Sequence, residues 1–215
     1  MLLHTRAVPP FEKNGFVLGC EETREAVVID PGDEVEELLA IVRDEGLSVA
    51  YILLTHAHLD HVSGVARAKA VLEAPIGLHR DDLFLYDAAV EQGLAFGIRI
   101  EPPPPVDFFF DGPGPWRFGR YEATVHHTPG HCPGGVCLQV GRTGETGQQL
   151  FVGDTLFAGS IGRTDLPGGD FATLIRSIRN VLFGFGDAAE VYPGHGPKTT
   201  IGRERRTNPF LTADL

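Results

Sequence analysis

A short segment in the first third of the chain, residues 56–61 (HAHLDH), holds three histidines and an aspartate within six positions. The apolar run at residues 51–54 stands before it and is typical of a buried strand. A strand that ends at Thr55 would carry the segment into a loop at the edge of a sheet, where functional groups are usually found. Imidazole suits zinc and iron, and the added carboxylate favours a hydrolytic or oxygen-handling centre over a structural one. The fold must therefore be one in which a strand delivers metal ligands to a sheet edge.

The spacing within this segment indicates more than one metal ion. His56 and His58 are two positions apart, so on an extended chain they point to the same side. Asp60 and His61 follow where the chain must turn, and they can approach from another side. A solvated loop without a role is the competing interpretation, but short His-rich tracts are themselves a metal-binding signal. We predict two metal ions that share this loop.

Apolar periodicity in the first half predicts a β-α-β unit. Residues 26–29 form a strand pattern that stops at the turn 30–32, and residues 33–45 have helical spacing with acids in the first turn. The strand at 51–54 completes the unit, which implies a parallel pair of strands with a right-handed crossover. The same patterns then predict helices at 62–72 and 81–96 and a strand at 75–78.

The second half is richer in strand patterns. The predicted strands lie at residues 117–118, 121–127, 135–140, 149–152 and 190–192, and a helix is predicted at 171–183. Each half thus runs from strands to a helix and back, which suits an α/β fold with two sheets between helix layers. No charged or Ser/Gly-rich linker interrupts the chain, so we expect one domain over residues 1–215.

Three further segments each place one potential metal ligand beside a glycine after an apolar strand. His131 closes the sequence TPGH, Asp154 follows Gly153, and His195 lies in the sequence YPGHG. Strand ends on one edge of a sheet converge in space, and ligand loops gather there. A satisfied loop residue is the better interpretation for any one of them alone, but the coincidence of all three with segment 56–61 favours a common centre.

The motif set HxHxDH, TPGH, GD and GH, in this order, resembles the metallo-β-lactamase superfamily over nearly the whole chain. The resemblance implies an αββα sandwich of two mixed β-sheets flanked by helices. It also implies seven ligands for two divalent ions, zinc first and iron or manganese as alternatives. By this resemblance the ligands of the first ion are His56, His58 and His131, those of the second are Asp60, His61 and His195, and Asp154 bridges both.

Details within the motifs point to one branch of that superfamily. A true β-lactamase typically has Cys or Ser where Asp154 stands, and residues 162–169 (GRTDLPGG) resemble the glyoxalase II-like hydroxyacylglutathione hydrolases. The segment 194–202, with Glu204 and residues 208–210, resembles the compact members of that branch. Because 20 residues follow His195, we expect no C-terminal helical domain that binds glutathione.

The expected activity is hydrolysis of thioesters of small acyl-thiols by a water held between the two ions, with Asp60 and Asp154 as catalytic residues. A persulfide dioxygenase with a single iron on His56, His131 and Asp154 is the first alternative. Such enzymes tend to carry a Cys where this chain has Ile161. A lactonase or another ester hydrolase could use the same centre, and a non-enzymatic metal scaffold is the remaining class.

Residues around the expected centre are assigned by position. Asp30, Thr55 and His127 are candidates for orienting the ligands by hydrogen bonds. Arg163 is a candidate for substrate binding, with an ion pair to Asp165 that orders its loop as the alternative. Two cations after His195 are further candidates for holding a substrate carboxylate, and these are Lys198 and Arg203.

Composition excludes several classes of protein. The formal net charge of −11 argues against a nucleic-acid surface, which would normally be basic. Three cysteines without CxxC spacing make a disulfide framework an unfavourable interpretation and suit a reducing compartment. No apolar stretch approaches the length of a membrane span, so we expect a cytoplasmic protein without membrane partners. We expect it to be a monomer or a small homo-oligomer.

Overall fold

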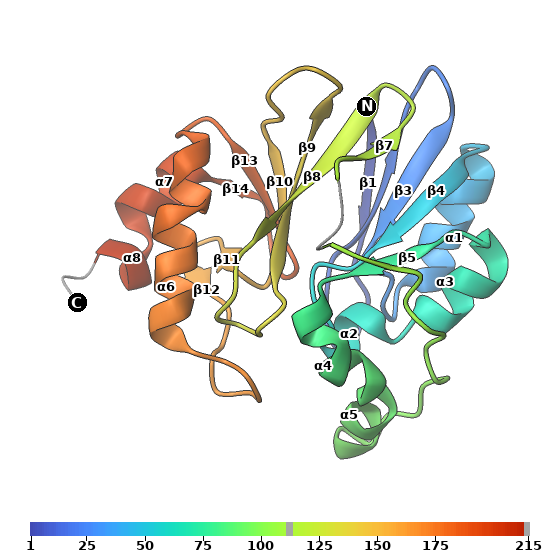
Figure 1. The fold of residues 1–215 in the computed structure, drawn as a ribbon, viewed down its shortest axis with the longest axis horizontal. Helices are drawn as coiled ribbons and strands as arrows, with labels where there is room; N and C mark the ends of the chain where they lie inside the picture. Colours follow the sequence, from blue (N-terminus) through green and yellow to red (C-terminus); the bar gives the residue numbers. More distant parts are fainter. Residues whose placement is uncertain (111–113, 213–215) are drawn as a thin grey trace.

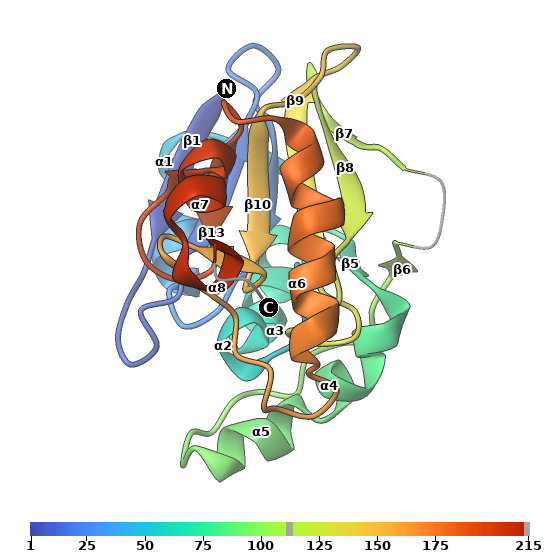
Figure 2. The same ribbon diagram turned by 90° about the vertical axis from the view of Figure 1, so that its left-hand side faces the viewer.

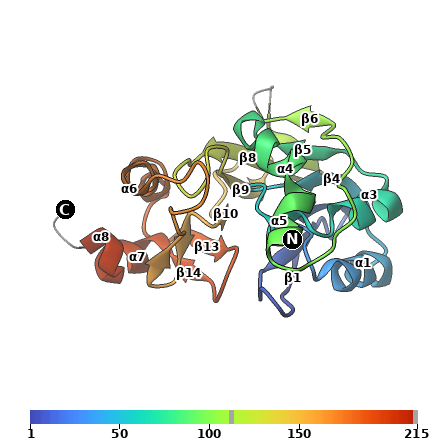
Figure 3. The same ribbon diagram turned by 90° about the horizontal axis from the view of Figure 1, so that it is seen from below.

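The computed structural model describes residues 1–110 and 114–212. Two six-stranded sheets pack face to face, and helices cover the outer face of each (Figure 1). The view from below shows α6, α7 and α8 on one side and α1 and α3 on the other, with the sheets between them (Figure 3). This four-layer arrangement confirms the predicted αββα sandwich.

The first sheet is antiparallel at one edge and parallel through the rest, with strands in chain order. Its strands are β1 (Leu2–Arg6), β2 (Gly15–Gly19), β3 (Glu25–Ile29), β4 (Ser48–Leu53), β5 (Ile76–Leu78) and β6 (Phe108–Phe109). The β3–α1–β4 unit is parallel as predicted.

The second sheet has the order β14-β13-β10-β9-β8-β7, and its one parallel pair is β10 with β13. Its strands are β7 (Trp116–Phe118), β8 (Tyr121–His127), β9 (Val136–Arg142), β10 (Gln149–Gly153), β13 (Glu190–Pro193) and β14 (Thr199–Thr200). A small separate pair joins β11 (Leu156–Phe157) to β12 (Ser160–Ile161).

The helices lie in three groups. Against the first sheet lie α1 (Val35–Asp44), α2 (Leu59–Val62) and α3 (Val65–Leu72), and beyond its end lie η1 (Arg80–Asp82), α4 (Leu83–Asp87) and α5 (Ala89–Ala95). Against the second sheet lie α6 (Phe171–Asn180), η2 (Leu182–Phe185), α7 (Ile201–Thr207) and α8 (Pro209–Thr212). Figure 2 shows α6 and α7 across the outer face of that sheet.

Apolar side chains fill three layers. Between the sheets, Leu18, Leu53 and Phe151 belong to one buried cluster. Other clusters join the first sheet to its helices and the second sheet to α6 and α7. None of the helices in the described part of the chain has the length and apolar character that crossing a bilayer needs.

Three predicted helices are divided or shortened in the structure. The helix expected at 62–72 is α2 and α3, which are separated at Gly64, where a Cβ atom would lie 2.3 Å from the Gly32 carbonyl oxygen. This close approach brings the turn after β3 against the metal-ligand segment. The helix expected at 81–96 is η1, α4 and α5, and the helix expected at 171–183 ends at Asn180 before η2.

The strand directions decide where the functional loops lie. Since β9 runs antiparallel to both β8 and β10, and β10 is parallel to β13, the strands β8, β10 and β13 end at one edge. The loops after these strands carry His131, Asp154 and His195. The loop after β4 carries residues 56–61 to the same place.

Candidate metal centre

All seven predicted ligands come together at this edge. They form three overlapping groups, in each of which the potential ligand atoms lie within 4.8 Å of one another. The groups are His56, His58 and His131; Asp60, His61 and His195; and His56, His61 and Asp154. The third group joins the other two, as a two-ion centre requires.

Three of the five histidine rings are held at Nδ1 by protein oxygens. The Nδ1 atom of His61 lies 2.9 Å from the Asp30 carboxylate, and that of His131 lies 2.7 Å from the Arg163 carbonyl oxygen. The Nδ1 atom of His56 lies 3.2 Å from the Thr55 hydroxyl. Metal-binding histidines commonly bond one ring nitrogen to a protein oxygen, so that the other is turned to the metal.

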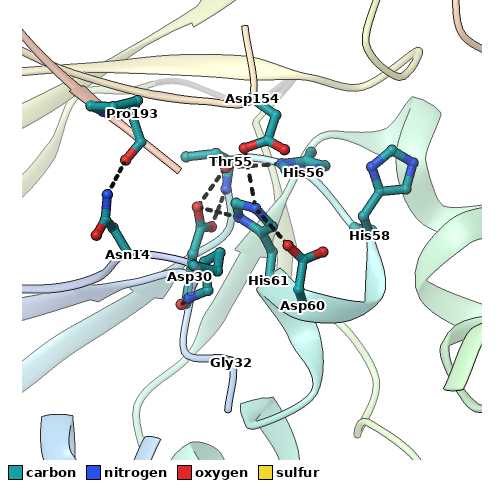
Figure 4. Close-up of polar contacts among 12 residues, drawn as sticks. Asn14, Asp30, Gly32, Thr55, His56, His58, Asp60, His61, Asp154 and Pro193 are labelled. Carbon is teal, nitrogen blue, oxygen red and sulfur yellow. Dashed lines mark hydrogen bonds and ion pairs between the residues drawn. The ribbon is translucent and has the colours of Figure 1, made fainter. Parts of the chain in front are cut away.

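Asp30 is the residue that organises the second group. Its carboxylate accepts hydrogen bonds from the Thr55 amide at 2.7 Å and the Thr55 hydroxyl at 2.6 Å, in addition to its contact with His61 (Figure 4). Asp30 itself has a φ of 49°, a left-handed conformation that aspartate tolerates better than most residues. The turn after β3 therefore reaches under the centre and fixes one of its ligands.

The buried polar atoms of the centre fit divalent cations. Within the described residues, Nε2 of His56 and Nε2 of His58 are buried without a hydrogen-bond partner, and Nε2 of His61 and Oδ1 of Asp154 have only each other, 3.4 Å apart. Leaving such atoms unsatisfied costs about 1–3 kcal/mol each. Nitrogen and carboxylate ligands of this kind suit zinc, iron or manganese. Gly194 is needed beside them, because a Cβ there would lie 2.2 Å from Oδ1 of Asp154.

Charges within the centre shift the pKa values of its members in opposite directions. Burial disfavours the charged form of His61, but neighbouring carboxylates, Asp60 foremost, outweigh burial and raise its pKa to about 10. Burial and the adjacent His131 lower the pKa of His58 to about 3. Burial opposes ionisation of Asp154, yet the charge on His61 holds the pKa of Asp154 below its usual range. These shifts favour the protonated form of His61 and the ionised form of Asp154.

Metal binding is therefore expected to release protons at pH 7. Because the pKa of His61 is about 10, its imidazole is protonated in the metal-free protein and must lose about one proton to bind a metal. Affinity should rise as the pH approaches 10. Calorimetric titration of the metal-free protein in buffers of different ionisation enthalpy measures this release, and a binding enthalpy independent of buffer would contradict it.

Asp82 is a further member of the site that sequence patterns did not reveal. It is fully buried in η1, and its carboxylate accepts hydrogen bonds from the amides of Ala57 at 3.1 Å and Gly134 at 2.5 Å. The Cys132 thiol also donates to it at 3.1 Å. Asp82 therefore ties the loop that carries His56 and His58 to the loop that carries His131.

Gln92 in α5 holds the same loop from the other side. Its amide nitrogen donates to the carbonyl oxygens of Ala57 at 3.2 Å and Leu85 at 2.7 Å, and its oxygen accepts from the Leu59 amide at 3.0 Å. A lone glutamine in a helical pattern has no motif around it, so no sequence signal could have identified this role.

The segment between β1 and β2 forms hydrogen bonds with the loop that carries His195. Asn14 donates to the carbonyl oxygen of Pro193 at 3.0 Å (Figure 4). It also donates to the carbonyl oxygen of Gly196 at 2.8 Å, on the other side of His195. The neighbouring Lys13 is buried, donates to the Asp30 carbonyl oxygen, and forms an ion pair with Glu34 at 2.6 Å. These contacts fix the position of the His195 loop against the turn after β3.

The structure brings some of the remaining predicted residues to the centre and places others away from it. Thr55 and Asp30 contact ligands directly through the hydrogen bonds given for them. His127 instead lies 2.8 Å from the Pro133 carbonyl oxygen and stacks on His79, with ring centroids 4.1 Å apart. It contacts none of the seven ligands through the bonds that fix its ring.

The two cations after His195 lie outside the site, contrary to the sequence-based expectation. The chain turns back at Gly196, and β14 pairs antiparallel with β13. This pairing carries Lys198 to the Glu190 carboxylate, 2.9 Å away at the far end of β13. Arg203 follows in α7, where its amide donates to the Thr200 side chain.

An open cleft of about 260 Å³ gives access to the centre. Five of the seven ligands line it, and these are His58, Asp60, His131, Asp154 and His195. The remaining lining residues are Phe11, Leu59, Gln92, Phe96, Arg163 and Leu166. A small molecule can therefore reach the ligand atoms directly from solvent.

Comparisons with known proteins agree with this geometry. The sequence profile of the metallo-beta-lactamase superfamily matches residues 9–195. A Haemophilus influenzae protein named hydroxyacylglutathione hydrolase GloC is 37% identical over 215 residues, covering 96% of each chain. The crystal structure of BLEG-1 B3 metallo-beta-lactamase has a TM-score of 0.88 at 37% identity, over 99% of this chain and 100% of that one. The crystal structure of TTHA1623 in a di-iron-bound form has a TM-score of 0.83 at 42% identity, over 97% of this chain and 100% of that one. The chain belongs to the metallo-beta-lactamase superfamily.

Proposed function

We propose that this protein is a dinuclear metal-dependent hydrolase of thioesters. The observation that carries the proposal is the set of three overlapping ligand groups, joined through His56 and His61, beside an open cleft that several of the ligands line. The name of the H. influenzae relative supports thioesters as the substrate class, and the di-iron form of TTHA1623 supports a centre of two ions.

The residues suit attack by water on a carbonyl. Divalent ions at such a centre lower the pKa of water and polarise a carbonyl oxygen. Asp60 lines the cleft, and its carboxylate lies 3.0 Å from Nε2 of His195. Burial opposes its ionisation, but His61 and His195 keep the pKa of Asp60 below its usual range. Asp60 therefore stays ionised and can accept a hydrogen bond that orients the attacking water.

The leaving group explains why a thioester suits this cleft. As the water oxygen bonds to the carbonyl carbon, the C–S bond breaks and a thiolate departs. A thiol has a pKa of about 8.5, so its thiolate leaves without the protonation that an amine needs. Cys132 does not compete as a nucleophile, because burial and the adjacent Asp82 raise the pKa of its thiol well above the usual value.

Hydrolysis of β-lactams is a second candidate, since BLEG-1 is described as a B3 metallo-beta-lactamase. One experiment distinguishes the two activities: the rates of thioester and β-lactam hydrolysis are measured on protein loaded in turn with zinc, iron and manganese. We expect thioester hydrolysis to exceed hydrolysis of a chromogenic β-lactam. Oxygen uptake with glutathione persulfide, measured on the iron form, tests the dioxygenase alternative. Turnover of the β-lactam or the persulfide without thioester hydrolysis would overturn the proposal.

The number of ions tests the dinuclear centre separately. We expect about two metals per chain in the fully loaded protein, because seven ligands are available in three overlapping groups. His195→Ala should lower this to about one, since it removes a ligand from the second group and leaves the first intact. Metal analysis after gel filtration measures the ratio, with His126→Ala as the control histidine outside the centre. A single ion in the loaded wild-type protein would favour the mononuclear alternative.

A further inference from the structure

The cleft above the metal centre has one aromatic wall made from two distant segments. Phe11 lies between β1 and β2, and Phe96 follows α5 directly. Their ring centroids are 6.1 Å apart with an interplanar angle of 87°, an edge-to-face contact. Leu59 and Leu166 also line the cleft and extend its apolar surface.

Phe96 remains largely exposed although it takes part in this contact. Its exposed fraction is 61%, and α5 lies beyond the edge at which β10 ends (Figure 2). A single exposed apolar side chain is ordinary. Here, however, the exposed ring lies at a cleft that continues to the metal ligands, so a bound molecule would cover it.

The same cleft offers little to an anionic substrate. Arg163 is the one arginine or lysine among the described residues that line it. Its guanidinium is already paired with the Asp165 carboxylate through two parallel hydrogen bonds of 2.7 Å, from Nε and Nη2. Lys198 and Arg203 lie outside the cleft. A carrier thiol with two carboxylates, such as glutathione, therefore finds few cations to bind here.

We infer that Phe11 and Phe96 form a subsite for an apolar group of the substrate. This inference rests on the proposed thioesterase function and narrows its substrate class to thioesters that carry an alkyl or aromatic group beside the reacting carbonyl. The group can belong to the acyl side or to the thiol side, because both adjoin the carbonyl. Its contact with the two rings adds apolar burial, so longer apolar groups should bind more tightly.

The test compares matched pairs of thioesters. On the acyl side, hexanoyl and acetyl thioesters of N-acetylcysteamine are compared. On the thiol side, acetyl thioesters of hexanethiol and of glutathione are compared. Each kcat/KM is divided by the rate of hydroxide hydrolysis of the same ester. Wild type should favour the apolar member of at least one pair, and Phe96→Ala or Phe11→Ala should reduce that preference about tenfold, mainly through KM.

Leu94→Ala is the matched control, because Leu94 lies in α5, is also 61% exposed and does not line the cleft. It should leave the preference unchanged. Equal preferences in wild type and both Phe variants would overturn the subsite, and so would a preference for the glutathione ester that neither variant alters.

Binding of an unreactive analogue separates the subsite from the reaction. The affinity of the loaded protein for S-hexyl-N-acetylcysteamine, a thioether, should also fall about tenfold in Phe96→Ala. If wild type hydrolysed none of the thioesters but this loss of affinity occurred, the thioesterase function would fail and the subsite would stand. If the protein hydrolysed the thioesters but both Phe variants kept the wild-type affinity for the thioether, the thioesterase function would stand and the subsite would fail.

Discussion

Asp154→Ala is expected to lower kcat/KM for thioester hydrolysis by about three orders of magnitude, which corresponds to about 4 kcal/mol of transition-state stabilisation. The Asp154 carboxylate lies 3.4 Å from Nε2 of His61, 3.7 Å from Nε2 of His131 and 3.6 Å from Nε2 of His195. It is the side chain that adjoins both ligand groups. If the proposed dinuclear centre is correct, removal of this side chain should weaken the binding of both ions.

Steady-state kinetics and metal analysis on the same preparation test this expectation. Asp187→Ala is the control, because Asp187 is an exposed carboxylate that pairs with Arg205 and Arg206 on the surface. It should behave as wild type. Near-wild-type turnover by Asp154→Ala at full metal content would show that the catalytic centre lies elsewhere.

The second large effect is expected in stability. Asp82→Ala should lower the free energy of unfolding by about 3 kcal/mol, because it leaves the buried amides of Ala57 and Gly134 without their acceptor. Since those amides belong to the loops that hold His56, His58 and His131, metal affinity should fall as well. Urea unfolding of the metal-free protein isolates the first effect, and metal titration measures the second.

Two further variants make this result specific. Asp82→Asn keeps one oxygen acceptor and should lose less stability than the alanine variant. Asp81→Ala changes the neighbouring carboxylate, whose side chain is 58% exposed, and should have little effect. If Asp81→Ala and Asp82→Ala were equally stable, the ties from η1 to the two ligand loops would contribute nothing measurable.

The sequence was sufficient for the layers of the fold and for the regular elements with clear apolar periodicity. The strand β3, the helix α1 and the strand β4 follow from such patterns, because their buried faces must be apolar wherever the chain packs. Elements whose stability comes from specific contacts were not predictable in this way. In α7, for example, the buried Glu204 carboxylate binds Thr199 and Asn208, and a polar sequence gives no periodic signal of this.

By itself the sequence also determined the seven candidate ligands, since each follows a strand within a short motif and strand ends at one edge converge. Only the tertiary structure decided what holds and surrounds them. Asp82 contacts Ala57 and Gly134 across 25 and 52 positions of the chain, and Lys198 lies far from the cleft because of the β13–β14 pairing. The physical reason is that hydrogen bonds act over about 3 Å, so partners from remote segments are set by how the layers pack and not by local pattern.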